Sequence, residues 1–206
     1  MKKILTTVAL MSTLITPQLS AVENNFIMDI MPLGITAHSN VDGFVNSYTS
    51  SSGYSYASET ISGSASFTPN IALGYGLDLP YFSLDATVGV GALVNGAFTA
   101  TYTQAELTAY VTTAQKGFMI GPFYRYLNYS DPQWATDNLS MKMIDSSAYA
   151  YGIAMMTGGK KVKFKLKVSE LNGADVAVAG KNGYTASSNV LSLDGVTVEL
   201  GLALRF

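Results

Sequence analysis

The last eleven residues, 196–206, alternate between two kinds of side chain without a break. Every even position carries Val, Leu or Phe, and every odd position carries Thr, Glu, Gly, Ala or Arg. Because successive side chains of a β-strand point to opposite faces, this pattern predicts a strand whose faces meet different environments. Strands in soluble proteins most often span about five or six residues. An alternation this long favours a membrane-spanning barrel, in which only one face of each strand meets lipid.

Similar alternation recurs upstream and predicts a single antiparallel transmembrane β-barrel of about eight strands, an all-β fold. The other expected strands are 26–37, 67–78, 82–92, 105–114, 118–129, 148–155 and 161–169. Pro32 cannot donate a ladder hydrogen bond, so we expect it at an edge or a bulge of the first strand. In the weakly alternating segment 105–114, we expect Leu107, Ala109 and Val111 to form the lipid face.

The composition agrees with a barrel rather than with membrane helices. Hydrophobic residues make up 48% of the chain, charged residues 13%, and the mean hydropathy is +0.23. Outside the N-terminus, however, no apolar run approaches the roughly 20 residues that a membrane helix needs. Expected turns and longer polar stretches alternate along the chain, as the connections of membrane barrels do. The turns lie at 79–80, 115–117 and 158–159, and the longer stretches at 38–62, about 96–104, 131–146 and about 176–189.

The first residues have the pattern of a secretory signal peptide. Lys2 and Lys3 precede a short apolar segment, Ile4 to Ile15, and Pro17 then ends any helix. Ala21 offers a small residue for cleavage, although the site is imperfect and the cut could fall several positions away. The sequence therefore predicts a signal peptide over 1–21 and one barrel domain over 22–206.

The end of the chain resembles the C-terminal assembly signal of bacterial outer-membrane β-barrel proteins. That signal combines a polar residue, a glycine two positions on, spaced apolar residues and a terminal aromatic, here Glu199, Gly201, Leu204 and Phe206. The resemblance covers the last eight residues. It implies a location in the outer membrane of a Gram-negative bacterium and recognition by the barrel-assembly machinery. It also implies contact with outer-membrane lipids and lipopolysaccharide, as a monomer, in the manner of the small OmpX/OmpA/OmpW-like barrels.

Charge and residue content exclude several function classes. Without Lys2 and Lys3, ten basic residues stand against fourteen acidic ones, a net charge of −4, which argues against a nucleic-acid partner. The chain has no Cys, so disulfides and thiolate metal sites are excluded. His38 is the only histidine, so no multi-histidine metal site can form, and we expect no metal and no cofactor.

His38 also bears on whether the protein is an enzyme. The segment from His38 to Asn40 resembles the motif of outer-membrane lipid A deacylases, which use a histidine and a serine on one strand face. Here Ser39 directly follows His38, and adjacent strand residues point to opposite faces. We therefore expect His38 to be a loop residue without a catalytic role.

Four lysines, at 161, 163, 165 and 167, lie on the same face of one expected strand. An eight-stranded barrel is just wide enough for its own side chains to fill it, so inward lysines need acidic partners. Candidate inward acids are Asp29, Asp85 and Glu199. We expect a lumen charge network in which lysines pair across the barrel with two of these acids; its residues are Lys163, Lys165, Lys167, Asp85 and Glu199. The alternative is an anion-selective wall.

Two function classes remain open, and an enzyme is a distant third. The first is a non-enzymatic outer-membrane barrel with a plugged lumen, which presents surface loops or supports the envelope, as OmpX/OmpA-type barrels do. The alternative is a narrow channel for small or apolar solutes, similar to OmpW-type barrels. The third is a lipid A-modifying enzyme. A filled lumen favours the first class, and fold alone names no ligand.

Overall fold

The computed structural model describes residues 22–39, 44–50, 55–61, 65–96, 98–113, 116–134, 141–144, 146–180, 184–186 and 190–206. The predicted signal peptide, residues 1–21, lies outside these described residues. All regular secondary structure in the described residues is β-strand. Among the described residues, no helix is long and apolar enough to cross a membrane.

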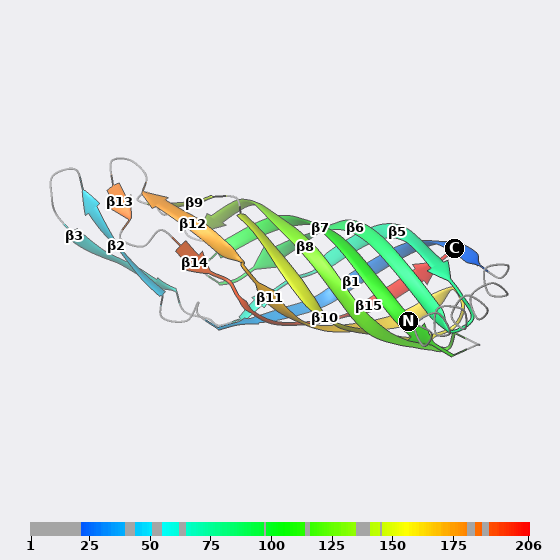
Figure 1. The fold of residues 1–206 in the computed structure, drawn as a ribbon. Coiled ribbons are helices and arrows are strands. Elements are labelled where there is room, and N and C mark those ends of the chain that lie inside the picture. The colour runs from blue at the N-terminus through cyan, green and yellow to red at the C-terminus, as the bar shows by residue number, and fades with distance from the viewer. Residues whose placement is uncertain are drawn as a thin grey trace, which may run out of the picture.

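Eight long strands form one closed antiparallel barrel (Figure 1), which confirms the predicted fold class. They are β1 (Glu23–His38), β5 (Asn70–Asp78), β6 (Phe82–Val94), β7 (Phe98–Thr112), β8 (Phe118–Trp134), β10 (Ser146–Gly158), β11 (Val162–Asn172) and β15 (Gly195–Arg205). The short strand β4 (Ala65–Phe67) precedes β5 and also pairs with β1 and β6. Each long strand pairs with its neighbours in chain order, and β1 pairs with β15 to close the barrel.

The closing seam contains the irregularity predicted at Pro32. Strand β1 pairs with β15 from Ile27, opposite Arg205, to His38, opposite Gly195. The register shifts between Ile30 and Leu33, on either side of Pro32. Because proline cannot donate to the ladder, it is tolerated where regular pairing is interrupted.

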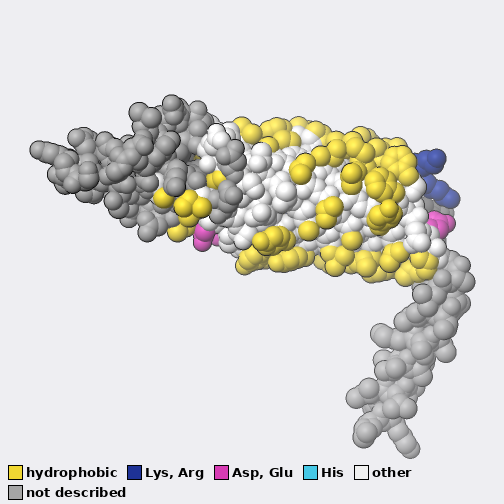
Figure 2. Space-filling view, turned by 90° about the horizontal axis from the view of Figure 1, so that it is seen from above, with side chains coloured by type: hydrophobic (Ala, Val, Ile, Leu, Met, Phe, Trp, Pro, Cys, Tyr) yellow, Lys and Arg dark blue, Asp and Glu magenta, His cyan; other side chains and the backbone are white. Residues whose placement is uncertain are grey.

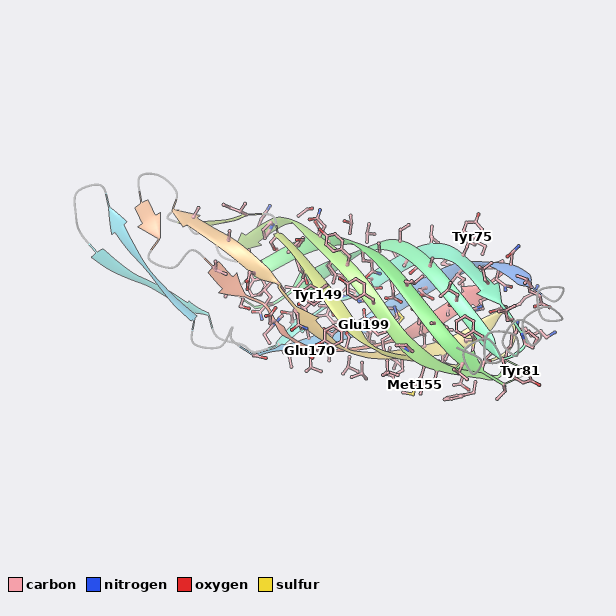
Figure 3. All side chains as sticks on the ribbon, viewed as in Figure 1. Tyr75, Tyr81, Tyr149, Met155, Glu170 and Glu199 are labelled. Atoms are coloured by element: carbon pink, nitrogen blue, oxygen red, sulfur yellow. The ribbon has the colours of Figure 1, made fainter. Side chains whose placement is uncertain are left out.

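The two faces of the wall follow the predicted alternation. On β7, Leu107 and Val111 are 52% and 65% exposed, whereas the intervening Thr108 and Tyr110 are buried. Tyr75 and Met155 likewise point away from the wall (Figure 3). Apolar side chains cover much of the barrel's outer surface (Figure 2), as expected for a wall that meets lipid.

The prediction of a polar loop at about 96–104 was wrong, because β7 already begins at Phe98. In its first residues the apolar side chains face inward and the polar ones outward, the reverse of the rest of the wall. Phe98 and Tyr102 are buried inside the barrel, and Thr101 faces outward. This part of the strand packs against an apolar cluster in the lumen, so its apolar side is the inner one. Strand β8 likewise continues to Trp134, beyond its predicted end at 129.

The other three longer connections, predicted as loops, contain strands of their own. The stretch 38–62 includes an antiparallel hairpin of β2 (Phe44–Ser50) and β3 (Ser55–Ile61), which β13 (Tyr184–Ala186) joins. Strands β9 (Met141–Ile144), β12 (Asp175–Gly180) and β14 (Val190–Ser192) form a second small sheet. Both sheets lie at one end of the barrel, the sheet end, opposite the turn end where the short connections lie (Figure 1).

Candidate functional site

Ten charged side chains are buried inside the barrel, and we call them the lumen charge network. Five are acidic and five basic, so the network carries no net charge among the described residues. None is more than 5% exposed. The members are Asp29, Asp78, Asp85, Glu106, Glu199, Arg125, Lys163, Lys165, Lys167 and Arg205. Buried charges persist in proteins only when they are paired, so the contacts of each member decide what the lumen can do.

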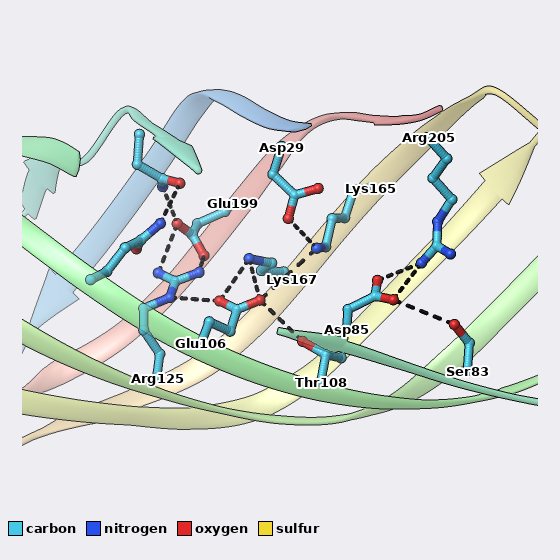
Figure 4. Close-up of polar contacts among 12 residues, drawn as sticks. Asp29, Ser83, Asp85, Glu106, Thr108, Arg125, Lys165, Lys167, Glu199 and Arg205 are labelled. Carbon is cyan, nitrogen blue, oxygen red and sulfur yellow. Dashed lines mark hydrogen bonds and ion pairs between the residues drawn. The ribbon is translucent and has the colours of Figure 1, made fainter. Parts of the chain in front are cut away.

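Glu106 on β7 is the centre of the network (Figure 4). Its carboxylate lies 2.8 Å from Nε of Arg125 and 2.8 Å from Nζ of Lys167. Nζ of Lys165 is 3.9 Å away, and the Thr108 hydroxyl donates a further bond of 3.1 Å. The ring of Phe123 lies 5.4 Å from both the Arg125 guanidinium and the Lys167 ammonium, which adds a cation–π contact to each.

Arg125 also binds Glu199 on the opposite side of the lumen. Nη1 and Nη2 donate to the two carboxylate oxygens at 3.0 and 2.6 Å, the fork geometry in which a guanidinium matches a carboxylate. Asn70 donates to Glu199 at 2.5 Å and in turn accepts from Gln104 at 3.1 Å. This set ties β5, β7, β8 and β15 together across the barrel interior.

Three further ion pairs lie nearer the turn end. Lys165 donates to Asp29 at 2.5 Å, which links β11 to β1. Arg205 donates to Asp85 at 2.6 and 2.5 Å and to Asp78 at 3.0 Å. Gly76 lies beside this group, where an added Cβ would come within 2.7 Å of Asp85 Oδ1, so the missing side chain leaves room for the pair.

All five residues predicted for the network lie inside the lumen, but the predicted pairing of lysines with Asp85 and Glu199 differs from the pairing observed. Both acids bind arginines instead, and Lys165 and Lys167 bind Asp29 and Glu106. Lys163 donates to the main-chain carbonyl of Lys116. An arginine offers two parallel donors to a carboxylate where lysine offers a point charge, which favours arginine at these acids.

Sequence reasoning missed Asp78, Glu106, Arg125 and Arg205 as members of the network. Arg125 and Arg205 occupy positions that alternation already assigns to the inner face, so their charge was a usable signal. Glu106 follows from the predicted register as well, because it lies between the outward positions 105 and 107.

Three residues of the predicted assembly signal lie on β15, and Phe206 follows it directly. Glu199 and Gly201 face the lumen, and Leu204 faces outward. Phe206 is 67% exposed at the turn end, and its main chain exchanges hydrogen bonds of 3.1 and 2.9 Å with Phe26. Recognition by assembly machinery stays a prediction.

An apolar cluster, the lumen cap, fills the barrel between the charge network and the sheet end. The rings of Tyr102 and Tyr129 meet edge to face with centroids 5.7 Å apart. Its other large members are Leu93, Phe98, Leu127, Leu171, Val176, Leu191 and Leu193. A cavity of about 20 Å³ lies where the cap meets Arg125 and Glu199, space for about one water molecule. Side chains therefore fill this part of the lumen.

His38 is not the loop residue that was predicted, because it ends strand β1 and its side chain is 6% exposed. Nδ1 lies 2.6 Å from the Leu193 carbonyl oxygen, and Nε2 lies 2.6 Å from Oγ of Ser66. A carbonyl oxygen can only accept, so Nδ1 carries the proton and Nε2 accepts from the Ser66 hydroxyl. A serine bonded to a histidine has the polarity of a nucleophile and its base. Ser66 is 2% exposed, however, and the geometry fits a clamp that joins β1, β4 and the Leu193 segment.

The clamp reading predicts a loss of stability on removal of the imidazole. We expect His38→Ala to lower the free energy of unfolding by about 1–3 kcal/mol, because a buried hydroxyl and a buried carbonyl lose their partner. Urea-induced unfolding in lipid bilayers measures the difference. Ser39→Ala is the control, since the Ser39 side chain is exposed. An equal loss in both variants would contradict the clamp.

A closed eight-stranded antiparallel barrel with an apolar exterior and a filled, charged interior defines the class: this is a β-barrel fold of the kind that crosses membranes. No family model and no curated protein matches the sequence. Among solved structures, the chain is similar to the crystal structure of Neisserial surface protein A, with a TM-score of 0.48 and 12% sequence identity. The match covers 90% of this chain and 99% of that one. The likeness concerns the fold.

Proposed function

We propose that this protein is a non-enzymatic barrel of the bacterial outer membrane whose lumen is closed, and that it holds its two small sheets at the cell surface. The observation that carries the proposal is the lumen charge network under its apolar cap. In membrane barrels of this type the short turns face the periplasm and the longer connections face outward. The turn end is then periplasmic, and the sheet end is external.

The chemistry of the network supports a closed lumen. A water column through the barrel would have to separate Glu106 from Arg125 and Lys167, and Glu199 from Arg125. Each of these groups is fully enclosed by protein, so its partners are the only source of compensation for the loss of hydration. The lumen cap adds a second barrier that offers few hydrogen-bonding groups to water.

The external sheets support a role in surface interaction. Strand β13 comes from the last long connection and pairs with β2 from the first, and β12 pairs with β9 from the connection between β8 and β10. Three connections are thus joined by backbone hydrogen bonds into paired strands. An arrangement of this kind suits contact with lipopolysaccharide or with a molecule outside the cell, and we propose such contact for a monomeric barrel.

Single-channel recording in planar bilayers tests the closed lumen. We expect the purified, refolded barrel to give no discrete conductance steps, because the network and the cap obstruct the path. An open pore-forming barrel reconstituted in the same way serves as the positive control. Reproducible steps from this protein would contradict a closed lumen and favour the alternative, a narrow channel for small solutes.

A further inference from the structure

The barrel has a cavity of about 510 Å³ at its turn end, which we call the vestibule. Its side-chain charges are strongly unequal, with five cations against two acids, Glu23 and Asp78. The cations are Lys116, Lys160, Lys161, Lys163 and Arg205. Lysine and arginine atoms gather at this end of the barrel in Figure 2. The ten-residue lumen charge network has equal numbers of acids and bases. The surplus positive charge of the vestibule therefore comes from Lys116, Lys160 and Lys161, which lie outside the network with only one further acid of the lining, Glu23.

The acids of the vestibule are already engaged. Asp78 accepts from Arg205 at 3.0 Å and from Asn25 at 3.0 Å, and Lys116 lies 3.3 Å away. The Ser83 hydroxyl donates to the same carboxylate. Glu23 is 3.8 Å from Lys116 and mostly exposed. Among the described residues, these contacts leave no further acidic side chain in the vestibule for the other lysines.

Several donors that line the cavity remain open. Lys163 is 2% exposed, and among the described residues its ammonium donates only to the main-chain carbonyl of Lys116, which leaves two of its three N–H groups. Nε of Arg205 also has no hydrogen-bond partner among the described residues, but this atom is buried and does not open onto the cavity. Within the described part of the chain, Lys160 and Lys161 have no acid within ion-pair distance. Lys163 is a buried donor with open N–H groups, and Lys160 and Lys161 are exposed cations beside it. A buried donor without a partner is costly, so Lys163 favours a ligand that supplies acceptors.

We propose that the vestibule binds a phosphate group, either of a phospholipid headgroup or of a soluble phosphate compound. A phosphate supplies several charged acceptor oxygens at once, which matches a group of ammonium donors. One such group also offsets the surplus of positive charge. This inference does not depend on whether the lumen conducts.

The rim of the vestibule determines which source fits better. Phe206 lines the cavity and is 67% exposed, and its ring lies 6.3 Å from that of Phe26. Aromatic rings at the end of a membrane barrel mark the boundary between hydrocarbon and headgroups. A headgroup phosphate at this depth would reach the lysines while its acyl chains stay along the apolar wall.

Binding of two probes to the full-length barrel, refolded in a detergent without phosphate, tests the proposal. The probes are inorganic phosphate and a short-chain phosphatidylglycerol, each titrated by calorimetry. We expect binding of at least the lipid probe, and about tenfold weaker binding to Lys160→Gln/Lys161→Gln. Both lysines are exposed and lie outside the lumen charge network, so the variant should keep the heat-modifiable mobility of the parent.

Lys142→Gln is the control, because it removes a positive charge from β9 at the sheet end. If the lipid binds more tightly than inorganic phosphate, and Phe206→Ala weakens the binding of the lipid, the headgroup is the source of the phosphate. Equal affinity for both probes would identify phosphate itself, and the proposal holds in either case. Failure of both probes to bind, or equal weakening by Lys142→Gln, would overturn it.

Discussion

Replacement of Glu106 by Gln should lower the free energy of unfolding by about 3–5 kcal/mol, the range found when one partner of a buried ion pair is removed. Gln keeps the size of the side chain but withdraws the negative charge that Arg125 and Lys167 share at 2.8 Å. Lys165, at 3.9 Å, loses part of its compensation as well. Urea-induced unfolding in lipid bilayers, followed by heat-modifiable mobility, measures the loss.

Two comparisons separate this effect from a general effect of charge. Glu170→Gln removes the same charge from an exposed position, where the carboxylate accepts a hydrogen bond only from Tyr151 among the described residues. This variant should lower the free energy of unfolding by about 1 kcal/mol or less. Glu106→Gln combined with Lys167→Met removes a matched pair, so the double variant should be more stable than the sum of the single losses predicts. Additive losses would show that Glu106 and Lys167 do not act as partners.

Local alternation was sufficient to predict the barrel wall. In β11 and β15, each residue's face follows from its parity, and the structure places these residues as predicted. The same rule explains why the start of β7 was missed. Near Phe98 the apolar residues face inward and threonines face outward, so the segment reads as polar although it is a strand. Polar side chains face inward where the lumen is charged, and apolar side chains face inward where the lumen is apolar.

Partner choice inside the lumen could not be predicted from alternation. Lys163, Lys165 and Lys167 share one face of one strand, yet they bind a carbonyl, Asp29 and Glu106 respectively. Lys167 is directly opposite Glu199 in the β11–β15 register, but Glu199 binds Arg125 from across the barrel. Contacts of this kind depend on strand tilt and on competition between side chains of different reach, which a single strand does not encode.

The small external sheets illustrate a second limit. Strand β13 spans three residues and pairs with β2, which lies far away in the sequence. A strand this short has too few residues for a periodic signal, and its partner is set by how the connections meet in space. Such segments read as loops in the sequence.

The outer wall gives the second large expected effect. Val88→Arg should lower the free energy of unfolding in bilayers by about 2–4 kcal/mol, because an arginine at mid-bilayer on the lipid face of a barrel costs that much. Val88 is 65% exposed at the centre of β6, and its cross-strand neighbours Leu73 and Ala105 offer no acid to bind the guanidinium.

Val111 provides a matched control for depth. It is also a valine, it is also 65% exposed, and it lies one residue from the turn end of β7, opposite Phe82. An arginine there can reach the headgroup region, so Val111→Arg should cost only about 0–1 kcal/mol. A soluble barrel would respond to the two variants alike, because both side chains would meet water. The measurement is the ranking of the urea unfolding midpoints of the two variants in bilayers. Equal costs at Val88 and Val111 would mean that this wall does not cross a membrane with β6 at mid-depth.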